Sequence, residues 1–199
     1  MPLLPPDLMA KSDFTTPIAV QAVLQAAYMG AMIIAPFLLE RRWGFRPTVI
    51  GLLMLPRPLA FAVAARLGGN HDLDKGARRI SITGSLVFAI AMLIAGIGAQ
   101  QKWLLIFILG AGLAGAGSGY IRATIANAAT SAAGDQDLGV AGGSLNMLQM
   151  VGGTIGITLA TAMLGTSTSG SRFMAIHLAA GMTALLAAFL ATKMKEPAA

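Results

Sequence analysis

The chain has 199 residues, of which 56% are hydrophobic and only 11% are charged. A soluble domain carries about 25% charged residues, so this composition excludes an ordinary globular protein and indicates an integral membrane protein. The formal charge of +6 comes mostly from basic residues at the ends of apolar stretches, where such residues orient membrane helices, so nucleic-acid binding is not indicated. The absence of cysteine excludes disulfides and thiolate metal sites.

Six apolar stretches are long enough to cross the hydrocarbon core, which needs about 20 helical residues. A segment exposed to lipid must satisfy its own backbone, and the length of these stretches favours helices over the short alternating strands of a barrel. The sequence therefore predicts an all-α membrane protein with an approach segment at 1–15, a six-helix transmembrane domain at 16–194 and a tail at 195–199. The predicted helices span residues 16–39, 48–67, 80–99, 103–129, 138–164 and 173–192. No cleavable signal peptide is expected, because MPLLPPDLMAKSDF lacks a basic n-region.

The first predicted helix carries a polar stripe. Gln21, Gln25 and Tyr28 recur at i, i+4 and i+7, which places them on one helical face. An amide inside a bilayer must face protein or a wet cavity. The stripe therefore either bonds to a neighbouring helix or forms the wall of a cavity, and the residues leave both alternatives open.

The second predicted helix contains Pro56, Arg57 and Pro58 in succession. The two prolines remove backbone donors and predict a kink. Arg57 lies about ten residues into the helix, or about 15 Å deep. A lone arginine at that depth is costly, so its side chain is expected to point inward to water, a carbonyl or an anionic partner.

The fourth predicted helix is rich in glycine, and Gly115 and Gly119 have the spacing that fits close helix packing. Arg122 and Asn127 follow in its second half and are candidates for lining a cavity, although Arg122 could instead lie near the far membrane interface. The third predicted helix, in contrast, carries hydroxyls but no amide or charge, and His177 is the only titratable group inside the sixth.

The fifth predicted helix has a stripe of small and amide side chains at helical spacing. Its members are Gly142, Asn146, Gln149, Gly153, Gly156 and Ala160. The amides must face protein or water, and the glycines allow a neighbouring backbone to approach and the helix to flex.

Buried polarity thus follows the order polar, polar, plain, polar, polar, plain along the six helices. A 3+3 inverted repeat would give this order if the first two helices of each unit lined a cavity and the third faced lipid. Loop charge sets the orientation, because seven basic residues share the side of the termini and five lie on the other side. Both termini are therefore expected in the cytoplasm.

Three segments carry a resemblance to a known family. DLGVAGGSLNMLQMVGGTIGITLATAMLG at 137–165 and RWGFRPTVIGLLMLPRPLAFAVAARLGG at 42–69 are similar to two helices of the major facilitator superfamily. The loop with Asp74, Lys75, Arg78 and Arg79 is similar to its cytoplasmic signature, with the glycine displaced by one position. From Phe14 to Leu164 the chain resembles the C-terminal six-helix half of the 14-helix drug/proton antiporter branch.

The resemblance implies half of a secondary transporter in a bacterial plasma membrane, which would export small amphipathic molecules or drugs in exchange for protons. Its partners would be the lipid bilayer, a small-molecule substrate and an N-terminal transporter half, joined in the same chain or supplied separately. The side chains expected to line the path are Gln21, Gln25, Tyr28, Arg57, Arg122, Asn127, Asn146 and Gln149. The glycines expected to pack or flex are Gly115, Gly119, Gly142, Gly153 and Gly156.

Two alternatives come from other functional classes. A rhomboid-type intramembrane serine protease would use Ser118 and His177, but the two residues differ in depth by about 15 Å, whereas a nucleophile and its base need about 3 Å. A packing module without transport would use the glycines and amides only to join helices. No phosphate-binding loop and no metal-ligand motif occur in the sequence, so neither an enzyme nor a cofactor is expected.

Overall fold

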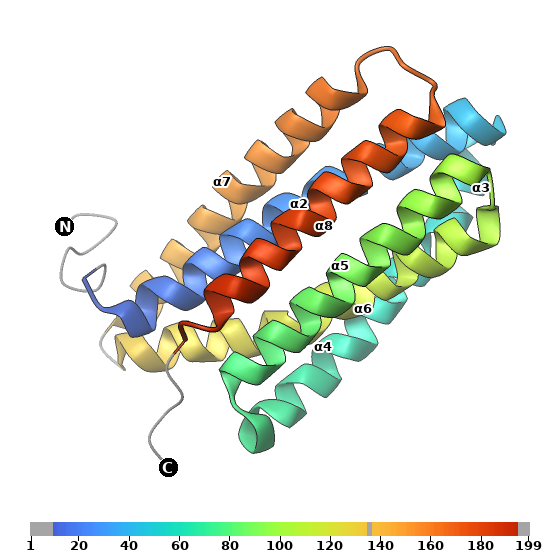
Figure 1. The fold of residues 1–199 in the computed structure, drawn as a ribbon. Coiled ribbons are helices and arrows are strands. Elements are labelled where there is room, and N and C mark those ends of the chain that lie inside the picture. The colour runs from blue at the N-terminus through green and yellow to red at the C-terminus, as the bar shows by residue number, and fades with distance from the viewer. Residues whose placement is uncertain (1–9, 135–136, 195–199) are drawn as a thin grey trace.

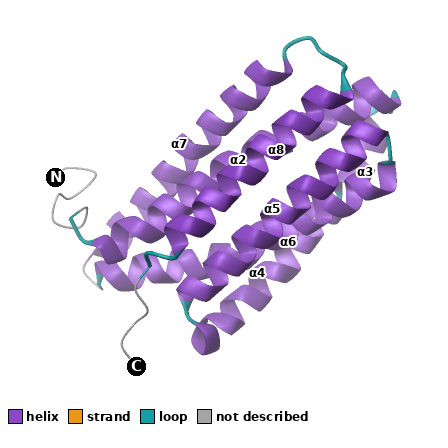
Figure 2. Ribbon diagram, viewed as in Figure 1, coloured by secondary structure: helices purple, strands orange, loops and turns teal. Residues whose placement is uncertain are grey.

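The computed structural model of the chain describes residues 10–134 and 137–194, the side chains of residues 72–75 excepted. Helices dominate this part of the chain, as Figures 1 and 2 show, and no strand occurs in it. The helices are α2 (Ser12–Trp43), α3 (Pro47–Met54), α4 (Pro56–Lys75), α5 (Ala77–Gln101), α6 (Leu104–Ala133), α7 (Leu138–Leu164) and α8 (Gly170–Ala191). Six of the described segments are long and apolar enough to cross a membrane, with α3 and α4 together forming one of them. The fold is therefore an all-α membrane protein.

The helices extend beyond most of the predicted spans. The first begins at Ser12, inside the segment expected to be an approach, whereas the fifth covers the predicted residues 138–164. Glycines with positive φ, which side-chain-bearing residues rarely adopt, follow the ends of α2, α6 and α7. Hydropathy marks the part of a helix that lies in hydrocarbon, and these glycines, rather than the loss of hydropathy, mark where those three helices stop.

The second span is broken where the sequence predicted a kink. α3 ends at Met54 and α4 begins at Pro56, because a proline can donate no backbone N–H to the preceding turn. Leu55 makes the join, and its N–H bonds to the Leu52 carbonyl at 3.2 Å.

The charged segment after this span is not the loop that the sequence predicted. α4 continues to Lys75 and α5 starts at Ala77, so that Gly76 alone separates them, with φ of 76°. One glycine with positive φ is sufficient to reverse the direction of the chain between α4 and α5. The basic residues Arg78 and Arg79 therefore lie in the first turn of α5.

The helix contacts have an internal symmetry. α2 packs along α7 as α6 packs along α4, and α2 packs on α8 as α6 packs on α5. α5 also packs on α8, and α2 on α6, which pairs equivalent helices. Exchanging the first three spans with the last three therefore maps the first four contacts onto one another in pairs and the last two onto themselves, as a 3+3 repeat requires. α2 begins and α8 ends at the same end of the bundle (Figure 1).

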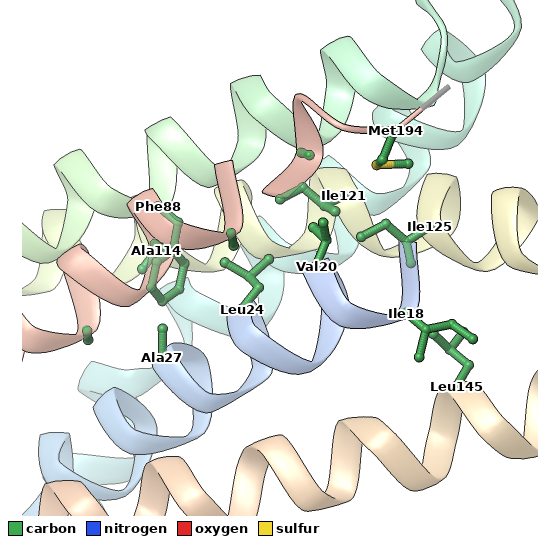
Figure 3. Packing of buried hydrophobic residues seen from close by; sticks show 14 of the residues in the cluster. Ile18, Val20, Leu24, Ala27, Phe88, Ala114, Ile121, Ile125, Leu145 and Met194 are labelled. Carbon is green, nitrogen blue, oxygen red and sulfur yellow. The ribbon is translucent and has the colours of Figure 1, made fainter. Parts of the chain in front are cut away.

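The larger hydrophobic core lies where α2, α5, α6 and α8 meet. Leu24 of α2, Phe88 of α5 and Ala114 of α6 belong to one buried cluster, part of which Figure 3 shows. Many of the buried residues are alanines, and several glycines lie against the backbone of a neighbouring helix, so the backbones approach closely in a medium where the hydrophobic effect cannot drive association.

The outer faces of α5 and α8 are apolar. Their exposed side chains lie three or four residues apart and form one stripe on each helix, as expected for a surface against lipid. The stripes consist of Leu86, Ile90, Leu93 and Ile97 on α5 and of Leu178, Met182, Leu185 and Phe189 on α8. The plain third and sixth spans thus turn bulky hydrocarbon side chains outward.

Candidate functional site

A polar groove of about 370 Å³ lies between α2, α6 and α7. Four of the eight predicted path residues line it, although they come from three helices far apart in sequence. Neither α5 nor α8 contributes a lining residue. The lining residues are Gln25, Met29, Arg122, Asn146, Gln149, Met150, Gly153, Thr154 and Ile157. The amides of α2 and α7 therefore share one concave surface with the guanidinium of α6.

Two glycines of α7 hold the helices close enough to form this groove. Gly152 and Gly156 lie directly against the backbone carbonyls of Ala22 and Ala26 on α2, where a Cβ would collide. In the other direction, a Cβ at Gly30 would lie 2.8 Å from the carbonyl oxygen of Gly156. Since these contacts are backbone to backbone, they leave the side chains on the adjoining faces of α2 and α7 free to form the groove wall.

The same device joins α4 to α6. Gly115 and Gly119, the pair that the sequence singled out, lie directly against the carbonyls of Arg57 and Phe61. Gly68 of α4 lies against the carbonyl of Tyr120 in return. The contact matches the α2–α7 contact, with two glycines four residues apart against two carbonyls four residues apart.

Arg57 is turned inward onto a carbonyl, one of the three partners that its depth predicted. It is 4% exposed, and its Nη2 donates to the carbonyl of Tyr28 at 3.0 Å. The guanidinium carbon also lies 4.3 Å from the centre of the Tyr28 ring. A desolvated cation above an aromatic face is stabilised by the ring quadrupole, so α4 is held to α2 at the point where the second span breaks.

The other predicted path residues lie outside the polar groove. Gln21 is buried and its Oε1 has no hydrogen-bond partner, whereas Tyr28 is half-buried under Arg57 between the rings of Phe61 and Phe88. Asn127 is exposed further along α6. Helical periodicity placed Gln21 and Tyr28 on the same face as Gln25, but Gln21 is buried and α4 and α5 cover Tyr28.

Two other predictions meet different surroundings. Gly142 was expected to pack or flex, but it is exposed, and a Cβ there would meet no described atom within 4 Å. The α2 backbone lies against Gly152 and Gly156, whereas nearer the start of α7 it is Ala141 and Leu145, not Gly142, that are buried in the core cluster shared with α2. In the charged segment, Arg78 and Arg79 are exposed, and the side chains of Asp74 and Lys75 lie outside the described part of the chain.

The groove also contains residues that the sequence reasoning missed. Met29 follows Gln25 by one helical turn, and Thr154 follows Met150 by one turn. Extending each amide stripe by i+4 would have found Met29, because that spacing keeps a residue on the same face. The same spacing leads from Asn146 to Met150 and on to Thr154, whose hydroxyl donates to the Met150 carbonyl of its own helix at 2.9 Å.

Curated proteins of similar sequence are bacterial transporters. The multidrug resistance protein Stp of Mycobacterium tuberculosis is 24% identical over 82% of this chain and 30% of its own length. The MFS-type transporter YfiU of Bacillus subtilis is 26% identical over 69% of this chain and 26% of its own length. The probable actinorhodin transporter of Streptomyces coelicolor is 29% identical over 82% of this chain and 30% of its own length. The chain resembles transporters of the major facilitator superfamily.

No protein-family model matches the chain. The chain spans less than a third of the length of these three transporters. Their similarity supports a role in membrane transport and favours neither the packing module nor the protease.

The pair required by the protease alternative is not assembled. The Ser118 hydroxyl donates within α6, to the Ala114 carbonyl at 2.9 Å, while the His177 ring bonds to the Phe173 carbonyl of α8 at 2.7 Å. His177 also meets the ring of Phe107, eleven residues from Ser118 along α6, or about 16 Å. Each side chain is thus bound to its own helix.

Proposed function

We propose that this chain is the C-terminal six-helix half of a major facilitator superfamily transporter of the 14-helix drug/proton antiporter branch. In this proposal the polar groove is its share of the translocation path, and an N-terminal half, in the same chain or supplied separately, covers it. The complete transporter exports small amphipathic molecules in exchange for protons from the cytoplasm of a bacterium.

One observation carries the proposal: polar side chains gather in one groove between α2, α6 and α7, while the outer stripes of α5 and α8 are hydrocarbon. Gln25, Asn146, Gln149 and the guanidinium of Arg122 line the groove, and its walls belong to α2, α6 and α7. Exposing such groups to lipid is costly, so this face requires water or protein against it. The apolar stripes of α5 and α8 require neither.

The mixture of side chains supports an amphipathic substrate. Met29, Met150 and Ile157 supply adaptable apolar surface, and flexible methionines suit binding surfaces that accept several ligands. The amides supply donors and acceptors for the polar end of a ligand. None of the described groove residues is acidic, so the proposal places the proton-coupling carboxylate in the N-terminal half.

Cysteine labelling tests the groove directly, because the chain contains no cysteine of its own. Single variants Gln25→Cys and Asn146→Cys report on the groove, and Leu86→Cys and Met182→Cys report on the apolar stripes. Each is made in the chain assembled with its N-terminal half and exposed in membranes to a water-soluble, membrane-impermeant maleimide from either side. The two groove variants are expected to react several times faster than the two stripe variants.

The stripe positions are matched controls because Leu86 and Met182 are more exposed in the isolated chain than Gln25. For Gln25, exposure alone would therefore give the opposite order of reaction rates. Equal labelling of the two pairs, or faster labelling of the stripe pair, would reject the groove as a water-filled path.

A packing module without transport is the second candidate, and the glycine–carbonyl contacts fit it as well as they fit a transporter. Gly152 and Gly156, together with Gly115 and Gly119, are explained by helix packing whether or not the chain transports anything. Co-expression with a separate N-terminal half distinguishes the two functions. Drug efflux that needs both pieces supports transport, whereas assembly with no efflux supports the module.

A further inference from the structure

Three arginines gather at the end of the bundle opposite the described termini. Arg41 donates from Nη1 to the carbonyls of Gly165 and Ser167, at 3.3 and 3.4 Å. Arg172 donates from Nη1 to the carbonyl of Leu164 at 3.5 Å. Arg42 bridges the carbonyls of Thr168 and Gln100, at 3.5 and 3.0 Å. This arginine cluster therefore surrounds the loop that joins α7 to α8.

The charge of the cluster is not neutralised within the described part of the chain. All of the hydrogen bonds of its three guanidinium groups go to backbone carbonyls. Each guanidinium has five N–H donors, so further donors remain on Arg41 and Arg172. Glu40, in the last turn of α2, is the only acidic residue of the described chain at this end, and it is exposed. The site thus has an excess of positive charge beside the membrane interface.

An apolar groove of about 230 Å³ lies between α2, α7 and α8. Leu159 and Met163 of α7 and Ile176 and Ala179 of α8 are among its lining residues. Thr183 is the only polar side chain in the lining, and its hydroxyl donates within α8, to the Ala179 carbonyl at 2.9 Å. The groove therefore offers hydrocarbon contact and no free polar group from a side chain.

The apolar groove and the arginine cluster are continuous. Met163 lines the groove and directly precedes Leu164, whose carbonyl accepts from Arg172. On α8, Ile176 follows Arg172 by four residues, one helical turn or about 6 Å. The helices that line the apolar groove thus also carry or contact the arginine cluster at one end of the groove. Figure 1 shows the path of the chain from α7 through the loop to α8.

We propose that this composite surface binds an anionic phospholipid, with its phosphate at Arg41 and Arg172 and an acyl chain in the apolar groove. The charge selects the occupant. A second protein helix would fill the groove but would leave the guanidinium groups without an anion, whereas a lipid phosphate accepts their remaining donors bidentately. The site is separate from the polar groove, so the proposal does not depend on transport.

The test uses the full chain in mild detergent, titrated with dioleoylphosphatidylglycerol or with dioleoylphosphatidylcholine, which has the same chains and no net charge. The apparent affinity is taken from the rise in melting temperature with lipid concentration. Phosphatidylglycerol is expected to bind more tightly than phosphatidylcholine. Arg41→Gln and Arg172→Gln are each expected to weaken it about fivefold, since one basic residue near a lipid surface contributes about that factor.

Two matched controls sharpen the result. Arg46→Gln removes the same charge at the same end from an exposed residue outside the cluster, and it should leave the affinity unchanged. Ala179→Leu fills the apolar groove, whereas Ala175→Leu adds the same side chain at an exposed position of α8 outside it. Only Ala179→Leu should weaken phosphatidylglycerol binding.

Three results would overturn the proposal. Equal affinity for the two lipids would show that the anionic headgroup is not recognised. If Arg46→Gln weakened binding as much as Arg172→Gln does, the effect would be general electrostatic attraction and not binding at the arginine cluster. If Ala179→Leu does not weaken phosphatidylglycerol binding, the acyl chain does not occupy the apolar groove.

A further titration with soluble glycerol phosphate separates a lipid from a free phosphate. If glycerol phosphate stabilises the wild-type chain as well as the intact lipid does, the ligand is a free phosphate. If Arg172→Gln does not fold, Arg41→Gln and the Ala179→Leu pair still decide.

Discussion

The guanidinium of Arg57 lies over the ring of Tyr28 and donates to the carbonyl of the same residue. One side chain thus fastens the broken second span to the first, next to the backbone contact between Arg57 and Gly115. Because Pro56 and Pro58 can donate no N–H to the carbonyls of α3, this attachment fixes α4 at a junction that has fewer hydrogen bonds than a continuous helix. The break in the second span and the buried arginine therefore form one structural unit.

Removing the ring should destabilise the bundle. Tyr28→Leu eliminates the aromatic face but keeps the backbone carbonyl, so only the cation–π attraction and ring packing are lost. A desolvated cation–π contact contributes about 2 kcal/mol, and the melting temperature of the detergent-solubilised chain should fall accordingly. Tyr28→Phe is the control, since it keeps the face. A drop in melting temperature as large for Tyr28→Phe as for Tyr28→Leu would show that the hydroxyl, not the ring, is what matters.

Adding one methyl group at two glycines of α7 should have opposite effects. Gly156→Ala places a Cβ on the carbonyl of Ala26, a backbone atom that can move only if the two helices separate, so the melting temperature should fall. Gly142→Ala meets no described atom within 4 Å and gains the better helix propensity of alanine, about 0.5–1 kcal/mol. It should raise the melting temperature slightly. Equal shifts in the same direction would contradict the packing described for α7.

The fold could be predicted from hydropathy and charge because each span is longer than the bilayer core requires. Its details could not. Periodicity placed Asn146 and Gly156 on one stripe, but it could not indicate that the α2 backbone lies against Gly156 while a Cβ at Gly142 would meet no described atom within 4 Å. It also could not identify which neighbour satisfies Arg57, since the Tyr28 carbonyl belongs to another helix. Local pattern therefore determines which face is polar, whereas tertiary packing determines which polar residues remain open to the groove.

The serine protease alternative makes a further clear prediction. Ser118 donates to the carbonyls of Ala114 and Gly115 in its own helix, so its hydroxyl is not activated by a base. A fluorophosphonate probe should label the wild-type chain no more than it labels the Ser118→Ala variant. Ser118→Ala should also keep its melting temperature within a few degrees, because the hydroxyl satisfies only carbonyls already bonded within the helix. Labelling that disappears in Ser118→Ala would revive the protease.

Two buried glutamines should separate packing from transport. Gln21 is 4% exposed with Oε1 unpartnered, so Gln21→Leu removes an unsatisfied acceptor and should leave the melting temperature unchanged or raise it. Gln149 is 8% exposed and lines the polar groove, so Gln149→Leu should preserve the fold but lower drug efflux by the chain assembled with its N-terminal half. Efflux by Gln21→Leu should remain close to wild type. The two substitutions are chemically identical and both affect largely buried amides, so only the groove distinguishes them. Equal loss of efflux in both variants would mean that Gln21 of α2 also takes part in transport although it lies outside the polar groove. Loss of efflux in neither variant would mean that the two amides serve only to join helices.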